Sequence, residues 1–139
     1  MTALRALVAD DDPEMLEMVS GIVARELGAI VTCAETGGEL LDAIASDEPF
    51  DFIVTDISMP WMTGLQVMHS ARTAGLPVPV VVMTALRDPA IAEQVEALGD
   101  RARLLLKPFA FQDLVAALHE VLHGAQLASV LRSERARSD

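Results

Sequence analysis

The side chains with the clearest chemical potential are three aspartates, one threonine and the only lysine of the sequence: Asp10, Asp11, Asp56, Thr84 and Lys107. Each stands at or just after the end of a short apolar run, where a buried strand would end. Carboxylates held about 5 Å apart repel one another by on the order of 3 kcal/mol per pair at an effective dielectric of about 20. One lysine cannot balance three carboxylates, so we expect a divalent cation among them, and oxygen ligands favour magnesium, calcium or manganese.

These residues also have structural interpretations. Asp12, the third acid of its run, precedes a proline and is expected to cap a helix rather than to bind anything. Asp10 and Asp11 could form a solvated acidic loop, and Thr84 could be an ordinary threonine at a strand end. Lys107 is more specific, because in a chain that otherwise uses arginine a compact ammonium suits pairing with a small anion or a carboxylate.

Short apolar runs alternate with amphipathic stretches along the chain, and this alternation must position the reactive side chains. The pattern predicts strands over residues 4–9, 29–34, 51–55, 79–83 and 103–106. It predicts helices over residues 13–27, 38–45, 64–73, 89–98 and 111–123. Strands that are apolar throughout, rather than alternating, are typical of a parallel sheet with helices on both faces.

The predicted fold class is therefore α/β, with a flavodoxin-like, doubly wound parallel sheet of five strands. In the strand order 2-1-3-4-5, the first, third, fourth and fifth strands are neighbours, and their carboxyl ends bring the reactive side chains into one pocket. The second strand ends in nothing reactive and is expected at the edge. Residues 1–124 are predicted to form the domain, and residues 125–139 a helix extension or a linker stub.

Composition excludes several classes of function. With 139 residues, 52% of them hydrophobic, the chain suits one domain with one core. A formal net charge of -11 disfavours direct binding to nucleic acid or to anionic lipid. Cys33 is the only cysteine, which excludes an intramolecular disulfide and fits a reducing compartment. No apolar run is long enough for a membrane span and no secretory signal is evident, so we expect a cytoplasmic location without membrane contact.

Four motifs occur in a fixed order between residue 4 and about residue 123. They are the pair Asp10-Asp11, the segment 51–64 with the sequence DFIVTDISMPWMTG, the VMTA of residues 82–85, and the LLLKPF of residues 104–109. Each motif alone would be weak, but together they are highly specific. Together they resemble the receiver, or phosphoacceptor, domain of two-component response regulators.

The resemblance implies that Asp56 is the phosphoacceptor, whose carboxylate takes a phosphoryl group from a phosphohistidine and becomes an aspartyl phosphate. It implies that Lys107 pairs with a phosphoryl oxygen and that Thr84 moves to hydrogen-bond the phosphoryl group. A carboxylate is a poor nucleophile toward a phosphoryl dianion unless negative charge is neutralised. The expected result is a signalling domain that changes conformation, and not an enzyme acting on other substrates.

The resemblance also implies Mg²⁺ as the cofactor, held by Asp11, Asp56 and the backbone carbonyl of Ser58, with Asp10 reaching it directly or through water. The implied partners are a sensor histidine kinase or phosphotransfer protein, and a downstream effector or an output domain missing from this chain. A homodimer remains open. In place of the aromatic residue or histidine that the family usually carries three residues before the lysine, this chain has Leu104, so the usual aromatic switch is missing.

Three competing functions are less well supported. Residues 119–123, His-Glu-Val-Leu-His, match the HExxH pattern of zinc proteases but lack an obvious third ligand, and a solvated helix face is the expected explanation. Phosphatases of the haloacid dehalogenase type need a second aspartate two residues after the nucleophile, where this chain has Ser58. The remaining alternative, favoured by Leu104, is a receiver-like interaction module that works without phosphorylation.

Overall fold

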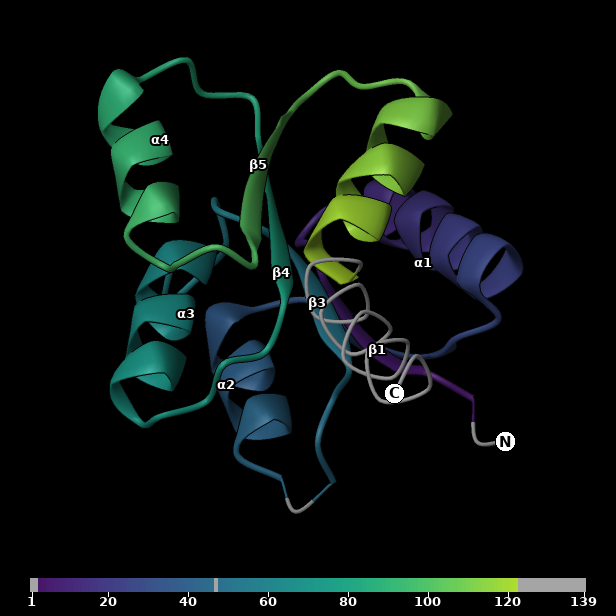
Figure 1. Cartoon of the computed structure of the whole chain (residues 1–139), viewed down its shortest axis with the longest axis horizontal. Coiled ribbons are helices and arrows are strands. Elements are labelled where there is room, and N and C mark those ends of the chain that lie inside the picture. Colours follow the sequence, from purple (N-terminus) through teal and green to yellow (C-terminus); the bar gives the residue numbers. More distant parts are fainter. Residues whose placement is uncertain (1–2, 47, 123–139) are drawn as a thin grey trace, which may run out of the picture.

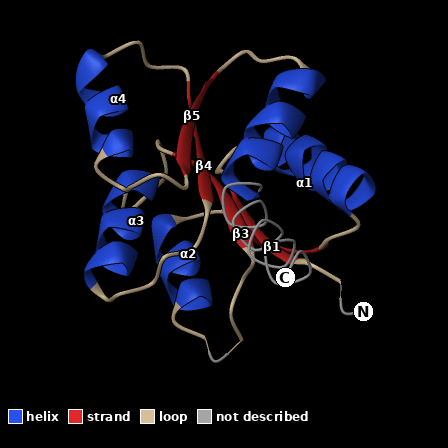
Figure 2. Ribbon diagram, in the orientation of Figure 1, coloured by secondary structure: helices blue, strands red, loops and turns tan. Residues whose placement is uncertain are grey.

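A computed structural model describes residues 3–46 and 48–122 of the chain. Five strands, β1 (Arg5–Ala9), β2 (Ile30–Ala34), β3 (Phe52–Asp56), β4 (Val80–Thr84) and β5 (Ala102–Leu106), form one parallel sheet. Their order is β2-β1-β3-β4-β5, as the sequence predicts, and the sheet runs through the centre of the molecule in Figure 2.

Helices cover both faces of this sheet. They are α1 (Pro13–Leu27), α2 (Gly37–Ile44), α3 (Gly64–Thr73) and α4 (Pro89–Glu96), and residues 111–122 are also helical. Figure 1 shows α1 and the helix over residues 111–122 on one side of the sheet, and α2, α3 and α4 on the other. The predicted doubly wound α/β class is confirmed.

Most predicted bounds differ from the observed ones by one or two residues, and those of α1 and α3 coincide with the prediction. The prediction for α4 was two residues too long, because the helix ends at Glu96. The Leu98 amide bonds three residues back to the Val95 carbonyl, and Gly99 then adopts a φ of 106° that ends the helical path. Residue 123, the last of the predicted fifth helix, and residues 125–139 lie outside the described residues.

Local capping explains why α1 begins and ends where it does. The Asp12 carboxylate accepts a hydrogen bond of 3.1 Å from the Glu14 amide, with Pro13 at the first helical position. Gly28 closes the helix with a left-handed φ of 62°. The expectation that Asp12 is a capping residue is therefore confirmed.

The core consists of two apolar clusters, one on each face of the sheet. Successive strand side chains point to opposite faces, so Ala6 and Val8 enter one cluster while Leu7 and Ala9 enter the other. The strand β2 is at the edge and is largely exposed, with Ile30 at 62%. The predicted edge position of β2 is confirmed.

The helix over residues 111–122 packs Leu114, Leu118 and Val121 into the core, as its periodicity predicts. Glu120, the central acid of the HExxH match, forms an exposed ion pair with Arg103 at 3.0 Å. The second histidine of that match lies outside the described residues. Within residues 3–46 and 48–122, no helix is both long and apolar enough to cross a bilayer.

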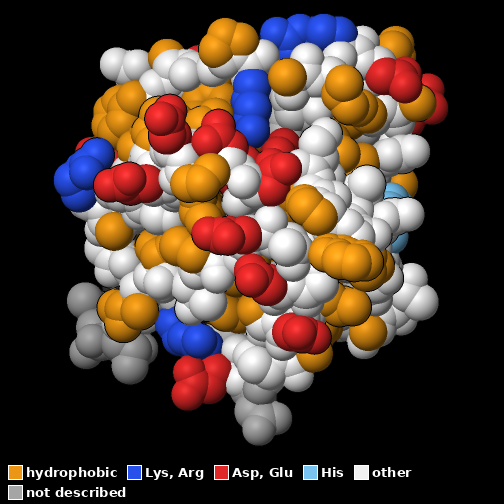
Figure 3. All heavy atoms as spheres, turned by 180° about the vertical axis from the view of Figure 1, so that it is seen from behind, with side chains coloured by type: hydrophobic (Ala, Val, Ile, Leu, Met, Phe, Trp, Pro, Cys, Tyr) orange, Lys and Arg blue, Asp and Glu red, His pale blue; other side chains and the backbone are white. Residues whose placement is uncertain are grey.

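Acidic side chains are prominent on the molecular surface. Figure 3 shows many Asp and Glu side chains and few Lys and Arg side chains on the face opposite to that of Figure 1. This distribution agrees with the formal net charge of -11. A surface of this kind has long-range repulsion for polyanions.

Candidate functional site

Three carboxylates converge where β1 and β3 end. These strands are neighbours, with Ala9 paired with Thr55, so Asp10 and Asp56 leave the same edge of the sheet. Asp10, Asp11 and Asp56 each have a carboxylate oxygen within 4.8 Å of the others. Asp10 is fully buried and Asp56 is 6% exposed, whereas Asp11 is exposed. The structure thus brings together the three acids that the sequence singled out.

Lys107 reaches the same point from the end of β5. Its Nζ donates a hydrogen bond of 2.9 Å to Asp10 Oδ2 and lies 3.4 Å from Asp56 Oδ1. Burial alone would lower the pKa of Lys107, but its bond to Asp10 and the charges of both aspartates outweigh burial and raise this pKa. The lysine therefore stays fully charged at neutral pH and balances part of the acidic cluster.

The carboxyl group of Asp56 remains short of positive charge. Burial and then the charge of Asp10 raise its pKa, and Lys107 and the Ile57 amide, which donates to Oδ1 at 2.9 Å, offset only part of this rise. A further cation next to Asp56 would favour its ionised form. The three side chains that could serve as metal ligands all offer carboxylate oxygens, so the cluster fits a hard divalent cation.

Thr84 lies at the end of β4, beside β3 in the sheet. It is almost fully buried, and its Oγ1 accepts a 3.0 Å hydrogen bond from the Leu86 amide. The Thr84 carbonyl accepts a 2.8 Å bond from the Lys107 amide, which joins the ends of β4 and β5. The structure therefore places Thr84 at the same edge of the sheet, where its hydroxyl accepts a hydrogen bond from the loop that follows β4.

Two other residues highlighted by the sequence, Ser58 and Leu104, lie on the elements that lead to this cluster, after β3 and within β5. Ser58 is exposed in the loop that follows Asp56, and its role as a carbonyl ligand stays a prediction. Trp61 in the same loop is 89% exposed, with a left-handed φ of 77°, so it is a surface residue and not a core residue. Leu104 is half-buried and packs against the core cluster on the α2–α4 side.

Two features of the site were not identified from the sequence. Arg87 donates a 3.1 Å hydrogen bond to the Lys107 carbonyl, linking the loops that follow β4 and β5. Gly64 lies so close to β3 that a Cβ atom built on it would be 2.2 Å from the Asp56 carbonyl oxygen. An arginine three residues after Thr84 is visible in the sequence, but its acceptor, twenty residues away, is not.

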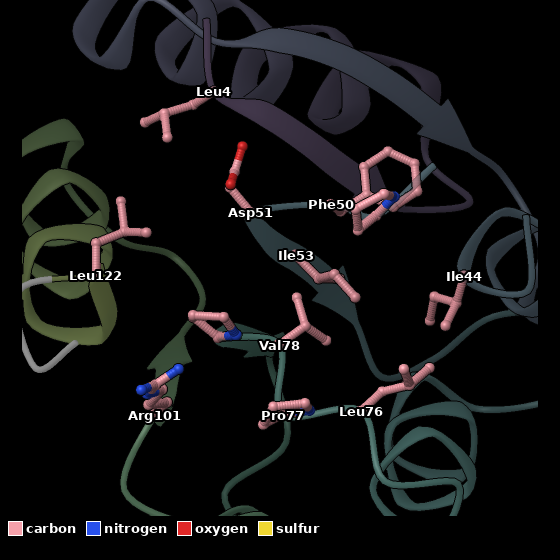
Figure 4. A pocket seen from close by; sticks show the side chains of 12 residues that line it. Leu4, Ile44, Phe50, Asp51, Ile53, Leu76, Pro77, Val78, Arg101 and Leu122 are labelled. Atoms are coloured by element: carbon pink, nitrogen blue, oxygen red, sulfur yellow. The ribbon is translucent and has the colours of Figure 1, made fainter. Parts of the chain in front are cut away.

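A separate apolar pocket of about 400 Å³ lies at the opposite end of the sheet. Its walls include Leu4, Asp51, Pro79 and Arg101, which directly precede β1, β3, β4 and β5. Figure 4 shows Asp51 and Arg101 among otherwise apolar side chains. None of the acids of the cluster lines this pocket, so the candidate site is the cluster at the carboxyl ends of the strands.

Comparison with known proteins identifies the family. Residues 6–119 match the family model described as the response regulator receiver domain. The chain is 39% identical to the response regulator MprA of Mycolicibacterium vanbaalenii, over 86% of this chain and 50% of that protein. A match of 37% identity to MprA of Mycobacterium ulcerans covers 90% of this chain and 53% of that protein. The chain thus spans about half the length of these curated relatives.

Solved structures agree with this result. The chemotaxis response regulator CheY4 of Vibrio cholerae matches with a TM-score of 0.74 and 31% identity, over 87% of this chain and 100% of that one. A CheY-like receiver domain protein from Methanospirillum hungatei matches with a TM-score of 0.80 and 26% identity, over 91% and 99% of the two chains. The fold, the ordered acidic cluster and these matches lead to one conclusion: the chain belongs to the receiver-domain family of two-component response regulators.

Proposed function

We propose that this receiver domain takes a phosphoryl group onto Asp56 and that Lys107, Thr84 and a bound Mg²⁺ support the transfer. The observation that carries the proposal is the convergence of three carboxylates, those of Asp10, Asp11 and the buried Asp56, within 4.8 Å of one another. The only lysine of the chain lies 3.4 Å from Asp56. The carboxylates would bind a divalent cation, and this cation and the ammonium of Lys107 would together place positive charge where a phosphoryl dianion arrives.

Asp56 supplies the nucleophile. Its contacts with the Ile57 amide and Lys107 both fall on Oδ1, which leaves Oδ2 for attack on phosphorus. A bond forms from this oxygen to the phosphorus as the bond from phosphorus to the donor histidine nitrogen breaks, and that nitrogen leaves with a proton taken from solvent. Lys107 then pairs with one phosphoryl oxygen, and the Thr84 hydroxyl donates to another.

Asp10, Asp11, Asp56 and the Ser58 carbonyl are the residues that would hold Mg²⁺. When bound, Mg²⁺ supplies positive charge that stabilises the phosphoryl oxygens. The raised pKa of Asp56 supports this assignment, since it reflects a buried carboxylate next to Asp10 whose charge Lys107 balances only in part. The acids and the lysine required for phosphoryl transfer are all assembled at one edge, so a receiver-like module that works without phosphate is not favoured.

The remaining parts of the proposal concern the wider protein. The donor of the phosphoryl group would be a sensor histidine kinase or a phosphotransfer protein in the cytoplasm. The signal would pass to a downstream effector or to an output domain. The only reactions catalysed would be the domain's own phosphorylation and dephosphorylation. Residues 1–124 would be the receiver and residues 125–139 a helix extension or a link to another part.

Mapping the phosphate tests this function. After incubation with Mg²⁺ and acetyl phosphate, mass spectrometry is expected to find a single hydroxylamine-sensitive phosphate, on the peptide that contains Asp56. Sensitivity to hydroxylamine is the property of an acyl phosphate, which distinguishes it from a serine or threonine ester. A phosphate located on another residue, or no uptake from any small phosphodonor or kinase, would reject the assignment.

Asp11 provides a test of the metal site. Replacing the exposed Asp11 with Ala removes one of three converging carboxylates, so the Mg²⁺ concentration for half-maximal phosphorylation is expected to rise about tenfold, as a loss of about 1.4 kcal/mol of binding free energy. Titration of Mg²⁺ against phosphorylation rate measures the change. Glu14→Ala, which removes an acid from the first turn of α1, is the control and should leave the requirement unchanged.

A further inference from the structure

The loop between β4 and α4 is tied to the site at two points. The Leu86 amide donates to Thr84 Oγ1 at 3.0 Å, and Arg87 Nη2 donates to the Lys107 carbonyl at 3.1 Å. Both acceptors belong to the two residues that would contact a phosphoryl group on Asp56. The loop and the site are therefore connected through hydrogen bonds and not only through chain continuity.

The main chain of Lys107 is the fixed end of the second bond. Its amide donates to the Thr84 carbonyl at 2.8 Å, directly after the paired residues Thr84 and Leu106 of the sheet. Its ammonium is held by Asp10 at 2.9 Å. Since the sheet and Asp10 already determine where Lys107 lies, the bond from Arg87 determines instead where the exposed loop lies.

We propose that Arg87 is a positioning residue that holds the β4–α4 loop in the conformation of the unphosphorylated domain. The inference rests on the proposed function for its relation to phosphate. Thr84 Oγ1 is engaged by Leu86, so turning this hydroxyl toward a phosphoryl group on Asp56 moves it away from the Leu86 amide. The loop then loses its hydrogen bond to Thr84, and the bond from Arg87 to the Lys107 carbonyl still restrains it.

A bond that must break before the loop can move opposes binding of anything that requires the moved loop. Arg87 is exposed, so its hydrogen bond to a backbone carbonyl is a modest one. Removing it is expected to tighten binding of a phosphoryl analogue about 2- to 10-fold. Loss of a positive charge near an anion site would instead weaken binding of the analogue, so the two roles of Arg87 predict changes in affinity of opposite sign.

The test compares Arg87→Lys and Arg87→Gln in the full chain, with affinity for beryllofluoride in the presence of Mg²⁺ measured by calorimetry. A restraining role predicts tighter binding in both variants, because neither side chain carries the terminal guanidinium nitrogen, Nη2, that donates to the Lys107 carbonyl. A purely electrostatic role predicts no change for Arg87→Lys and weaker binding for Arg87→Gln, and that result would overturn the proposal. Arg103→Gln, which removes an arginine paired with Glu120, is the control and should match the wild type.

A second measurement separates this inference from the phosphoacceptor assignment. In metal-free protein, hydrogen exchange of the Leu86 amide is expected to be about 2- to 10-fold faster in Arg87→Lys than in the wild type, by the same gain in loop freedom. Unchanged exchange would reject the restraint whatever the binding data show. Faster exchange in a protein that binds no beryllofluoride would reject the proposed function while retaining the restraint.

Discussion

Replacing Asp56 with Asn is expected to reduce uptake of hydroxylamine-sensitive phosphate below detection. The amide of asparagine carries no negative charge and cannot form a stable acyl phosphate, whereas its size and its bond to the Ile57 amide can be kept. Mass spectrometry after treatment with Mg²⁺ and acetyl phosphate measures the effect. Label that persists in Asp56→Asn would show that another residue is the acceptor.

The same substitution is expected to raise the free energy of unfolding at neutral pH in metal-free buffer. Burial and Asp10 raise the pKa of Asp56 in the folded state, so the protonated form is favoured there relative to the unfolded chain. The stability contribution of Asp56 is therefore fully present below its unfolded pKa of 3.8 and is lost as pH rises through the higher folded value. Asparagine does not titrate, so the advantage of the variant should appear as pH rises from acid to neutral.

Asp12→Asn is the matched control for both effects. Asp12 adjoins the cluster but caps α1, and asparagine caps helices as well as aspartate does. This variant should take up phosphate like the wild type and should have the wild-type free energy of unfolding at pH 7. Denaturant titrations at several pH values, with chelator present, provide the comparison. An Asp56→Asn variant that is less stable than the wild type at pH 7 would contradict the charge balance derived for the site.

Gly64→Ala is expected to lower the free energy of unfolding by about 2 kcal/mol or more, in the range of overpacked sites. A Cβ on Gly64 would lie 2.2 Å from the Asp56 carbonyl oxygen and 2.8 Å from Thr55 Oγ1. Both atoms are buried within the end of β3, and the Asp56 carbonyl also accepts a bond from the Thr55 hydroxyl. The start of α3 must move away from the strand, so the geometry around the phosphoacceptor should change as well.

Gly38→Ala is the control for this effect. Gly38 also lies in the first turn of a helix, α2, but the nearest atom to its added Cβ is Thr36 Oγ1 at 3.7 Å, an ordinary contact. Alanine there is expected to leave stability unchanged or to raise it by about 0.5 kcal/mol, because glycine is a weaker helix former. Equal stabilities of the two variants in urea would mean that α3 does not approach β3 as closely as described.

Features that depend on neighbouring residues were predictable from the sequence. The helices α1 and α3 have the predicted bounds, because a capping residue or a turn signal marks each end. The apolar strands, and the parallel sheet that strands of this kind usually form, followed from composition. These properties depend on hydrophobic periodicity and on local hydrogen bonds, which a short window of sequence contains.

The composition of the site was also predictable, but only through the assumed strand order. Asp10 and Lys107 are 97 residues apart, and they meet because β1, β3, β4 and β5 are adjacent and parallel. Once that order is assumed, all strand ends must meet at one edge of the sheet. The residue types at those ends then determine the chemistry.

The tertiary structure decided what depends on close approach and burial. These are the bond from Arg87 to the Lys107 carbonyl, the contact between Gly64 and β3, and the direction in which the pKa of Asp56 is shifted. Each is a balance of distances between residues far apart in the chain, and a shift of about 1 Å would change it. Sequence patterns specify which elements form and which residues end them, whereas only the packed structure determines how closely those ends approach.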